Sequence, residues 1–166
     1  MKQEKQALLT LDIQFFAGKN KNALRGHFVQ LYTPGVEVPV EDDWLELAHQ
    51  IATISDDTQE DTEDQAYYDG DGTPETSVIS VAGAYSVSGN YDSSDPAQEL
   101  IADLKYKIGD GRKVWHRVVS SDQTKEWVGR ATVTSIIAGS GDASAWEEFS
   151  CNIRFDKIPT ESLVTP

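Results

Sequence analysis

The sequence predicts a mainly β fold, an antiparallel β sandwich or barrel with one flanking α-helix. Three observations support this: several segments alternate between apolar and polar positions, one segment has helical spacing, and Gly- or Pro-rich turns separate them. The 166 residues are 39% hydrophobic, enough for one core. We expect an N-terminal arm over residues 1–22, one β domain over residues 23–158 and a C-terminal arm over residues 159–166.

The first segment is expected to be an extended arm. Its apolar stretch, residues 7–17, is interrupted by Asp12 and Gln14, which does not fit a secretory signal. The larger apolar side chains occupy alternate positions, which favours an extended arm over a helix. These side chains are Leu9, Leu11, Ile13 and Phe15.

A short strand is expected at residues 28–32, before a Pro-Gly turn. Residues 44–54 fit helical spacing in part but contain β-branched residues, so helix and strand both stay open. Residues 55–75 are expected to form a long acidic loop that contains the adjacent Tyr67 and Tyr68. A loop of about twenty residues is typically functional or disordered.

The longest alternation predicts a strand over residues 77–91 with one apolar face and one face of small or polar side chains. Gly83 and Gly89 fall in the apolar register and indicate bends or bulges. The apolar face is Ile79, Val81, Tyr85, Val87 and Tyr91, and the other is Val78, Ser80, Ala82, Ala84, Ser86, Ser88 and Asn90.

One amphipathic helix is expected at residues 95–108. Asp95 is its N-cap, Pro96 its first helical residue, and Gln98 completes a variant of the capping box. Gly109 is a suitable stop. The apolar stripe, which should pack on a sheet, is Ala97, Leu100, Ile101, Leu104 and Ile108.

Three further strands are expected at residues 112–119, 126–138 and 146–155, because each alternates with period two. A Gly-rich turn at residues 139–142 joins the last two strands as a hairpin. The rest of the chain, residues 156–166, is expected to be an extended tail.

Charge is distributed unevenly within a formal net charge of −14. Residues 1–25 carry five basic and two acidic side chains, residues 26–104 carry eighteen acids and no Lys or Arg, and residues 105–166 carry nine bases and eight acids. So acidic a chain is a poor nucleic-acid binder. The acids form a solubilising surface, or they face the basic end of another copy, or they line something that must not bind a polyanion.

The sequence shows no catalytic constellation, so we expect no enzymatic activity, metal or cofactor. His27, His49 and His116 are scattered, and Cys151 is the single cysteine. Residues 69–73 resemble the start of a calcium loop but lack its later glycine and glutamate. No apolar stretch is long enough to span a membrane. Core or interface packing is favoured over sugar stacking for Trp44, Trp115, Trp127 and Trp146.

Three segments carry a resemblance to a known family: residues 67–72 (Tyr-Tyr-Asp-Gly-Asp-Gly), residues 83–92 at the end of the long strand, and residues 95–101 at the helix start. Together they resemble major tail tube proteins of long, non-contractile-tailed bacteriophages (siphophages). Residues 11–17 (Leu-Asp-Ile-Gln-Phe-Phe-Ala) also resemble an N-terminal segment of structural proteins from phages of Gram-positive hosts. The resemblance spans about residues 8–158.

The resemblance implies a structural virion protein. Six copies would close into a ring, and rings would stack into a hollow tail tube through which DNA passes without specific binding during ejection. It also implies assembly in the bacterial host cytoplasm, with the tape measure protein, the distal tail or tip proteins and the tail terminator as partners. We expect no membrane partner.

This hypothesis assigns apolar residues on the arms and the loop to contacts between subunits: Leu9, Leu11, Phe15, Phe16, Tyr67, Tyr68, Ile158, Leu163 and Val164. It assigns residues on the small polar face of the long strand to the lumen: Ser80, Ser86, Ser88 and Asn90.

Other functions compete with this hypothesis. A carbohydrate-binding β-sandwich module would be a stable monomer whose Trp fluorescence shifts with a saccharide. A jelly-roll hydrolase would lose turnover when a single Asp or Glu is replaced. A type VI secretion tube protein has a related fold, and the sequence separates it from the phage protein only through the N-terminal segment.

Overall fold

The computed structural model describes residues 20–164. The sequence interpretations that involve Leu9, Leu11, Phe15 and Phe16 therefore lie outside the described residues. The strands are β1 (Gly26–Leu31), β2 (Leu45–Glu46), β3 (Ile51–Asp56), β4 (Gln59–Gln65), β5 (Glu75–Ala82), β6 (Ala84–Asn90), β7 (Lys113–Val119), β8 (Lys125–Ala138), β9 (Glu148–Phe155) and β10 (Thr160–Leu163). The helices are α1 (Pro96–Asp103) and the 3-10 turns η1 (Asn22–Leu24), η2 (Glu41–Asp43) and η3 (Gly109–Arg112).

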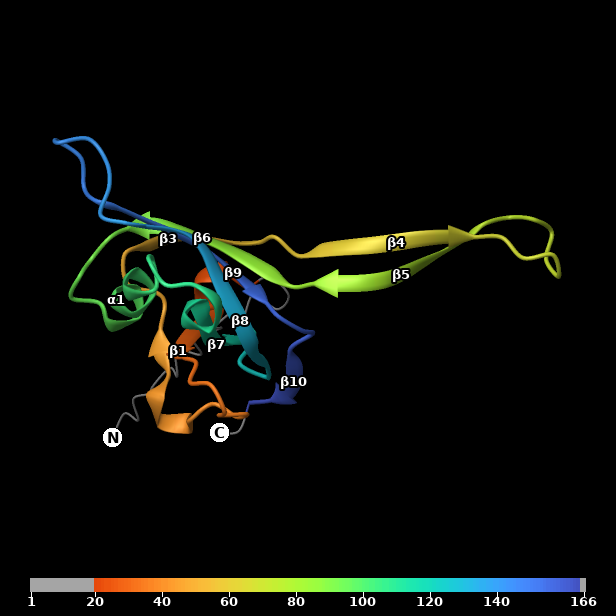
Figure 1. Cartoon of the computed structure of the whole chain (residues 1–166), viewed down its shortest axis with the longest axis horizontal. Helices are drawn as coiled ribbons and strands as arrows, with labels where there is room; N and C mark the ends of the chain where they lie inside the picture. The colour runs from red at the N-terminus through yellow and green to blue at the C-terminus, as the bar shows by residue number, and fades with distance from the viewer. Residues whose placement is uncertain (1–19, 165–166) are drawn as a thin grey trace, which may run out of the picture.

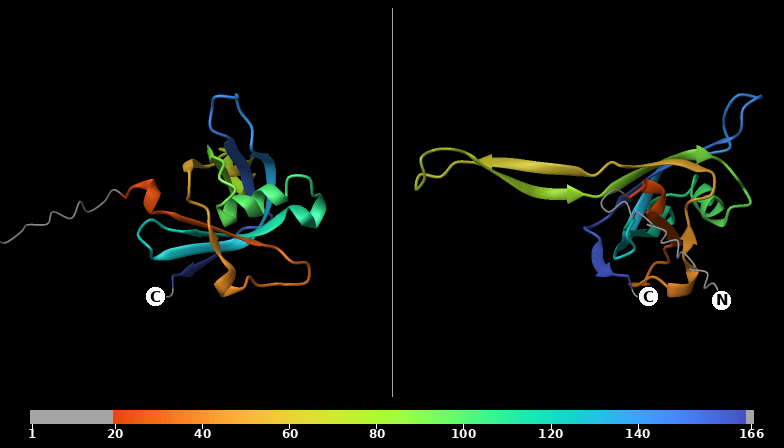
Figure 2. Two further views of the ribbon diagram at one scale, coloured as in Figure 1. Left: turned by 90° about the vertical axis from the view of Figure 1, so that its left-hand side faces the viewer. Right: turned by 180° about the vertical axis from the view of Figure 1, so that it is seen from behind.

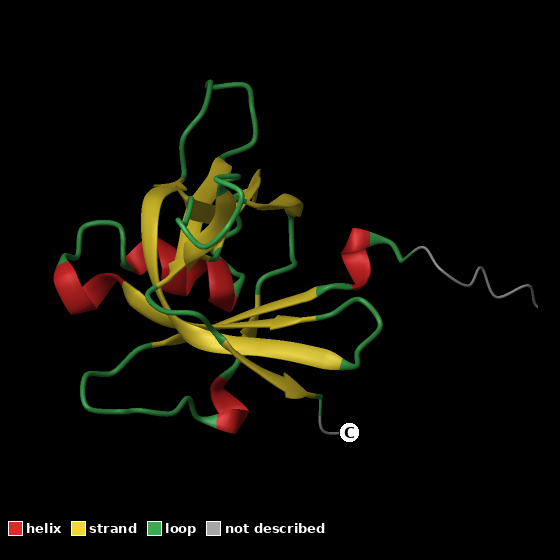
Figure 3. Cartoon of the chain, turned by 90° about the vertical axis from the view of Figure 1, so that its right-hand side faces the viewer, coloured by secondary structure: helices red, strands yellow, loops and turns green. Residues whose placement is uncertain are grey.

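The expected mainly β fold with one helix is confirmed. Seven strands follow the order β2-β1-β7-β8-β9-β6-β3, and β10 pairs with β8 off this path. All these pairs are antiparallel. The sheet curls on itself like half of a barrel, and α1 lies inside the curl (Figures 2 and 3).

The core fills the space between the concave side of the sheet and α1. Ile101 and Leu104 of the helical segment are fully buried, as are Val29, Val114 and Ile153 of the sheet. The inward positions of β9 show why the strand forms there, since its burial alternates along the whole strand. This packing fixes α1 against β8, β1 and β2.

The helix begins as expected and ends earlier. Asp95 accepts a hydrogen bond from the Gln98 backbone N–H at 2.8 Å, and Pro96 is the first helical residue. The fully buried Gln98 side chain bonds elsewhere, accepting from the Asp92 N–H and donating to the His49 carbonyl. The predicted end at residue 108 is corrected to residue 103, because the chain turns away there and leaves Ile108 89% exposed.

The segment expected as an acidic loop is largely a β-hairpin. Within residues 55–75, β3 ends and all of β4 forms, and β4 pairs antiparallel with β5 along its whole length. The hairpin projects far from the body (Figure 1). A signal for it was present in the sequence, since two Asp-Gly dipeptides, typical of tight turns, separate β4 from β5. The high acid content obscured it because Asp and Glu are rare in strands.

The predicted strand over residues 77–91 is divided at Gly83 into β5 and β6. Ile79 and Val81, expected in the core, are 62% and 40% exposed because β5 belongs to the projecting hairpin. At the division the Phe155 backbone N–H donates to the Gly83 carbonyl at 2.9 Å, and the Phe155 ring lies 3.2 Å from where a Gly83 side chain would begin. Because β9 ends at Phe155, β5 continues beyond Gly83 paired only with β4. Of the expected inward face, Val87 is buried.

The remaining strands lie within a few residues of the expected ranges. The ambiguous segment 44–54 forms β2 and the start of β3. A bulge in β8, with Ser135 at a positive φ of 51°, shifts the alternation there. Ile136 is therefore buried, whereas Ile137, which an unbroken period of two would place on the face of Ala131 and Val133, is 40% exposed.

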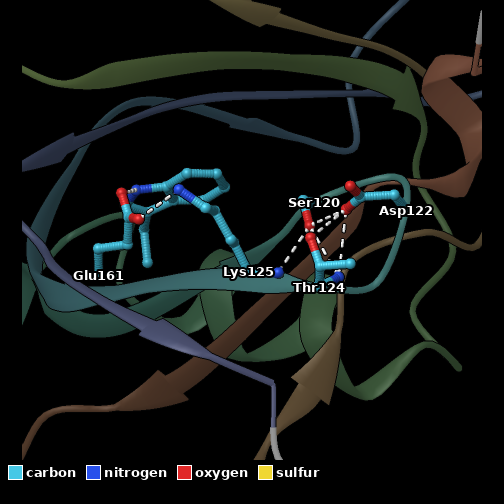
Figure 4. A network of polar contacts seen from close by, with 6 residues as sticks. Ser120, Asp122, Thr124, Lys125 and Glu161 are labelled. Carbon is cyan, nitrogen blue, oxygen red and sulfur yellow. Dashed lines mark hydrogen bonds and ion pairs between the residues drawn. The ribbon is translucent and has the colours of Figure 1, made fainter. Parts of the chain in front are cut away.

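The C-terminal arm does not extend freely, because β10 pairs with β8 of the same subunit. Glu161 accepts hydrogen bonds from Lys125 Nζ at 2.6 Å and from Trp127 Nε1 at 3.1 Å. Beside them, the β7–β8 turn is closed by Asp122, which accepts from the hydroxyls of Ser120 and Thr124 (Figure 4). These contacts hold the described end of the chain on the body.

Candidate assembly surfaces

The β4–β5 hairpin is the most prominent surface feature. Every residue of β4 is exposed, as are all residues of β5 except the last. Val78 is 54% exposed, and at the tip Tyr67 is 55% exposed and Tyr68 fully exposed. The hairpin and its tip carry these acids and no base: Glu60, Asp61, Glu63, Asp64, Asp69, Asp71 and Glu75.

Internal bonds organise the hairpin without giving it a core. Thr76 Oγ1 donates to Asp64 and Ser80 Oγ donates to Asp61, both at 2.7 Å. A two-stranded hairpin alone in water is marginally stable at best, and exposed apolar side chains on it gain nothing until another surface covers them. The arrangement is therefore that of an arm suited to docking on a partner.

A second surface is the convex side of β3, β6 and β9, which carries small polar side chains. Cross-strand pairing places Ser86 beside Asn152, Ser88 beside Ser150, and Asn90 beside Glu148. The structure thus brings Ser86, Ser88 and Asn90 to one face. Ser80 is not on it, because it lies in the hairpin beside Asp61.

This polar face is not acidic. Along β9 its outward residues run from Glu148 through Ser150 and Asn152 to Arg154, so the two charges offset each other at opposite ends. Many of the acids of the chain are concentrated on the hairpin instead. One role left open for the acidic side chains was to line a channel that must not bind a polyanion. They do not gather on this face.

The curled sheet ends in an open edge at β3. This strand pairs with β6 on one side, and among residues 20–164 no strand covers its other side. An unpaired edge leaves backbone N–H and C=O groups available for a strand of another chain. At the other end of the sheet, β2 is only two residues long.

The predicted C-terminal contact residues differ in their surroundings. Ile158 and Leu163 are 76% and 74% exposed, whereas Val164 is half-buried and donates its N–H to the Thr124 carbonyl at 3.1 Å. Ile158 also lines an apolar depression with Trp127 and Phe155 at the root of the hairpin. Tyr67 and Tyr68 lie at the distant tip, so the structure separates the predicted contact residues into two regions.

The titratable side chains of the described part of the chain do not gather into a metal site. Among residues 20–164, no three His, Cys, Asp or Glu side chains are placed to hold a metal ion, and no helix there is long and apolar enough to cross a membrane. His27 and His116 are buried with ring nitrogens 3.4 Å apart. Burial lowers the pKa of His27 to about 4 and that of His116 to about 3, which makes both neutral structural groups at pH 7.

The buried thiol and the tryptophans also have structural surroundings. Burial raises the pKa of Cys151 to about 12, so the thiolate required for nucleophilic chemistry does not form near neutral pH. Trp146 is 83% exposed on the β8–β9 loop, whereas the other three tryptophans are partly buried on different elements. They do not form a shared stacking platform.

No protein-family model matches the chain, and no curated protein matches it significantly. Several chains of solved structures are similar to it, among them two from gene transfer agent particles. One is a chain of the tail of an empty gene transfer agent particle with C6 symmetry, with a TM-score of 0.59 and 15% identity, covering 89% of this chain and 100% of that one. The other is a chain of the virion of a native gene transfer agent particle, with a TM-score of 0.55 and 13% identity, covering 84% and 95%. At these identities the likeness shows a common fold.

Proposed function

We propose that the chain is a structural, non-enzymatic subunit of a phage-like tail. Six copies close into a ring, and the rings stack into a hollow tube that DNA crosses during ejection. The observation that carries the proposal is the fold, which covers 89% of this chain and occurs in a particle tail with C6 symmetry. The resemblance of residues 67–72, 83–92 and 95–101 to siphophage tail tube proteins supports the same role.

The open sheet edge supports closure into a ring. A curled sheet whose outer β3 edge is open is incomplete by itself, and sheet edges tend to associate unless they are covered. When the contacts between neighbours are head-to-tail and the rotation closes, a ring forms and every edge is covered. The six-fold symmetry of the structural neighbour gives the number of copies in the proposal.

The polar face supports a channel lining. Ser86, Ser88 and Asn90 are small and uncharged, so they offer hydrogen bonds to water but no cation that would hold a phosphate backbone. We assign these three residues to the lumen and leave Ser80 to the hairpin. DNA would then pass such a surface without specific binding.

Apolar residues of the hairpin tip and of the two ends of the chain are assigned to contacts between subunits. They are Tyr67 and Tyr68 at the hairpin tip, and Ile158, Leu163 and Val164 near β10, together with Leu9, Leu11, Phe15 and Phe16 of the N-terminal arm. In the assembled particle the proposed partners are the tape measure protein, the distal tail or tip proteins and the tail terminator. The proposed location is the virion tail, after assembly in the bacterial host cytoplasm.

The first test is electron microscopy of the concentrated, untagged protein, with and without a nucleating tail tip. Rings or hollow tubes with six-fold symmetry are the expected result. Protein that remains monomeric even with the tail tip present would contradict the proposal, and a saccharide that then shifts Trp fluorescence would favour the carbohydrate-binding alternative.

A hairpin variant separates folding from assembly. Thr58 and Gly83 flank the hairpin where β3 and β6 remain paired, since the Asp57 N–H donates to the Ala84 carbonyl at 2.8 Å. Replacing residues 59–82 with an Asn-Gly turn should therefore leave the body folded, with an unchanged urea midpoint, but unable to form tubes. Normal tubes from this variant would show that the hairpin is not an assembly element.

The lumen assignment has its own test. Ser86→Lys combined with Ser88→Lys places two cations on the polar face and should slow DNA ejection if that face lines the channel. Glu37→Lys with Glu41→Lys, at exposed positions away from this face, is the matched control. Equal ejection rates for the two variants would contradict the assignment.

A further inference from the structure

Residues 105–113, between α1 and β7, form an exposed platform. The helix ends at Asp103, and the chain leaves the core after the buried Leu104. Tyr106 and Ile108 are therefore 90% and 89% exposed. Lys107 is exposed between them, and Lys105 lies with its Nζ 5.7 Å from the centre of the Tyr106 ring. The platform therefore presents apolar and cationic groups together.

Arg112 holds the platform in place. Its guanidinium donates to the Lys107 carbonyl at 2.7 Å, to the Lys105 carbonyl at 2.7 Å and to the Val133 carbonyl of β8 at 3.4 Å. The exposed side chains thus stand on a backbone that is tied to the sheet. A surface that is already ordered loses little entropy when a partner binds.

Of the three lysines of the platform, Lys113 has carboxylate partners in the described part of the chain, whereas Lys105 and Lys107 do not. Lys113 is paired with Asp110 at 2.9 Å and lies 3.7 Å from Asp156. Lys105 and Lys107 make no ion pair with any carboxylate of residues 20–164, although the protein has 28 acidic residues. A shallow depression of about 500 Å³ lies beside them, lined by Lys107, Ile108 and the β8 residues from Thr132 to Ser135.

The β4–β5 hairpin has the complementary chemistry. It carries acids without a base, and the exposed Val78 and Ile79 lie on its second strand. The hairpin projects from one end of the body, and α1, which leads into the platform, lies at the other end (Figure 1). The hairpin therefore points away from the platform of its own subunit.

The geometry points to docking of the hairpin of one copy on the platform of residues 105–113 of a neighbouring copy. This inference rests on the proposed self-assembly and names the receiving surface. Acids of β4 face Lys105 and Lys107, and exposed apolar residues of the hairpin cover Tyr106 and Ile108. Because the two surfaces differ, the contact is heterologous, and each copy offers both halves of it to further copies.

A charge exchange between the two surfaces tests the inference. One variant carries Lys105→Glu with Lys107→Glu, and the other carries Glu60→Lys with Glu63→Lys, two acids that make no side-chain hydrogen bond in the hairpin. Each variant alone should need a concentration on the order of tenfold higher, or more, to assemble. Mixed in equal amounts, the two should assemble as the wild type does, because each reversed hairpin meets a reversed platform. Lys21→Glu with Lys157→Glu, at exposed positions elsewhere, is the matched control.

Two readouts separate this inference from the proposed function: electron microscopy of the assembled protein, with the tail tip as nucleator, and zero-length cross-linking of a mixture of isotope-labelled and unlabelled chains. Intermolecular links from Lys105 or Lys107 to acids of the hairpin are the supporting result, and they support docking even if no hollow tube is seen. Tubes that form equally well from the platform variant, or cross-linked assemblies without these links, overturn the inference and leave the tube proposal standing.

Discussion

Lowering the pH from 7 to 5 should destabilise the folded subunit through the buried pair His27 and His116. Their ring nitrogens lie 3.4 Å apart, the His116 ring stacks on Phe155 with centroids 5.2 Å apart, and Tyr85 packs edge-on against both histidines. His116 Nδ1 has no hydrogen-bond partner among the described residues. Burial, with Arg25 as a further cause at His27, lowers both pKa values.

The sign and size of the effect follow from these pKa values. A histidine in the unfolded chain has a pKa near 6.5, whereas the folded values are about 4 for His27 and about 3 for His116. As the pH falls below 6.5, the unfolded chain binds protons that the folded chain does not, so stability is lost. At pH 5 the loss is about 2 kcal/mol for each histidine and about 4 kcal/mol for the pair.

Urea unfolding followed by Trp fluorescence at pH 7 and pH 5 measures this loss. His116→Leu removes one titrating group at similar volume, so the variant should lose about 2 kcal/mol where the wild type loses about 4 kcal/mol. His49→Gln, at an exposed histidine whose Nε2 lies 3.1 Å from Asp92 Oδ2, leaves both buried histidines in place and should keep most of the wild-type loss. A wild-type loss below about 1 kcal/mol, or equal losses in the wild type and His116→Leu, would refute the reasoning.

Three further predictions concern the body of the subunit. Burial raises the pKa of Cys151 to about 12. At pH 8 its thiol should therefore react with a thiolate-specific reagent only as fast as the protein unfolds around it. Labelling at the rate of an exposed cysteine would contradict this. Gly89→Ala should lower the free energy of unfolding by about 1–3 kcal/mol, because the added Cβ would clash with the Gln50 carbonyl oxygen. The control Ser88→Ala, in the same strand, should change the free energy of unfolding little. Glu161→Gln should speed amide hydrogen exchange in β10 without moving the urea midpoint, since it removes the negative charge that pairs with Lys125 Nζ. Unchanged exchange would show that strand pairing alone holds β10.

The projecting hairpin also has a consequence for exchange measurements. Its backbone is paired only within β4 and β5, without a buried side to support it. In the isolated subunit its amides should therefore exchange faster than those of β8 and β9, whose inward residues are buried. In an assembled tube the same amides should become protected, and hydrogen exchange before and after assembly would measure the difference.

Several elements could be predicted from the sequence because their signals are local. The Asp95 cap, Pro96 and the first turns of the apolar stripe lie within a few residues of one another, and α1 begins where they indicate. The alternation in residues 112–119 and 146–155 likewise marks β7 and β9 to within two residues. Caps and periodicity depend on neighbouring side chains and the intrinsic backbone geometry, so they are visible without the fold.

The candidate surfaces required the tertiary structure. Alternation put Ile79 and Ser86 in one strand, but β5 pairs only with β4 in the projecting hairpin, so Ile79 lies in solvent, while Ser86 stays on the body beside β9. Likewise, the apolar stripe included Ile108, but the helix ends at Asp103 and Ile108 is 89% exposed. Periodicity indicates which residues share a face of a strand. Contacts between residues far apart in the sequence decide which strands pair and which faces are then covered.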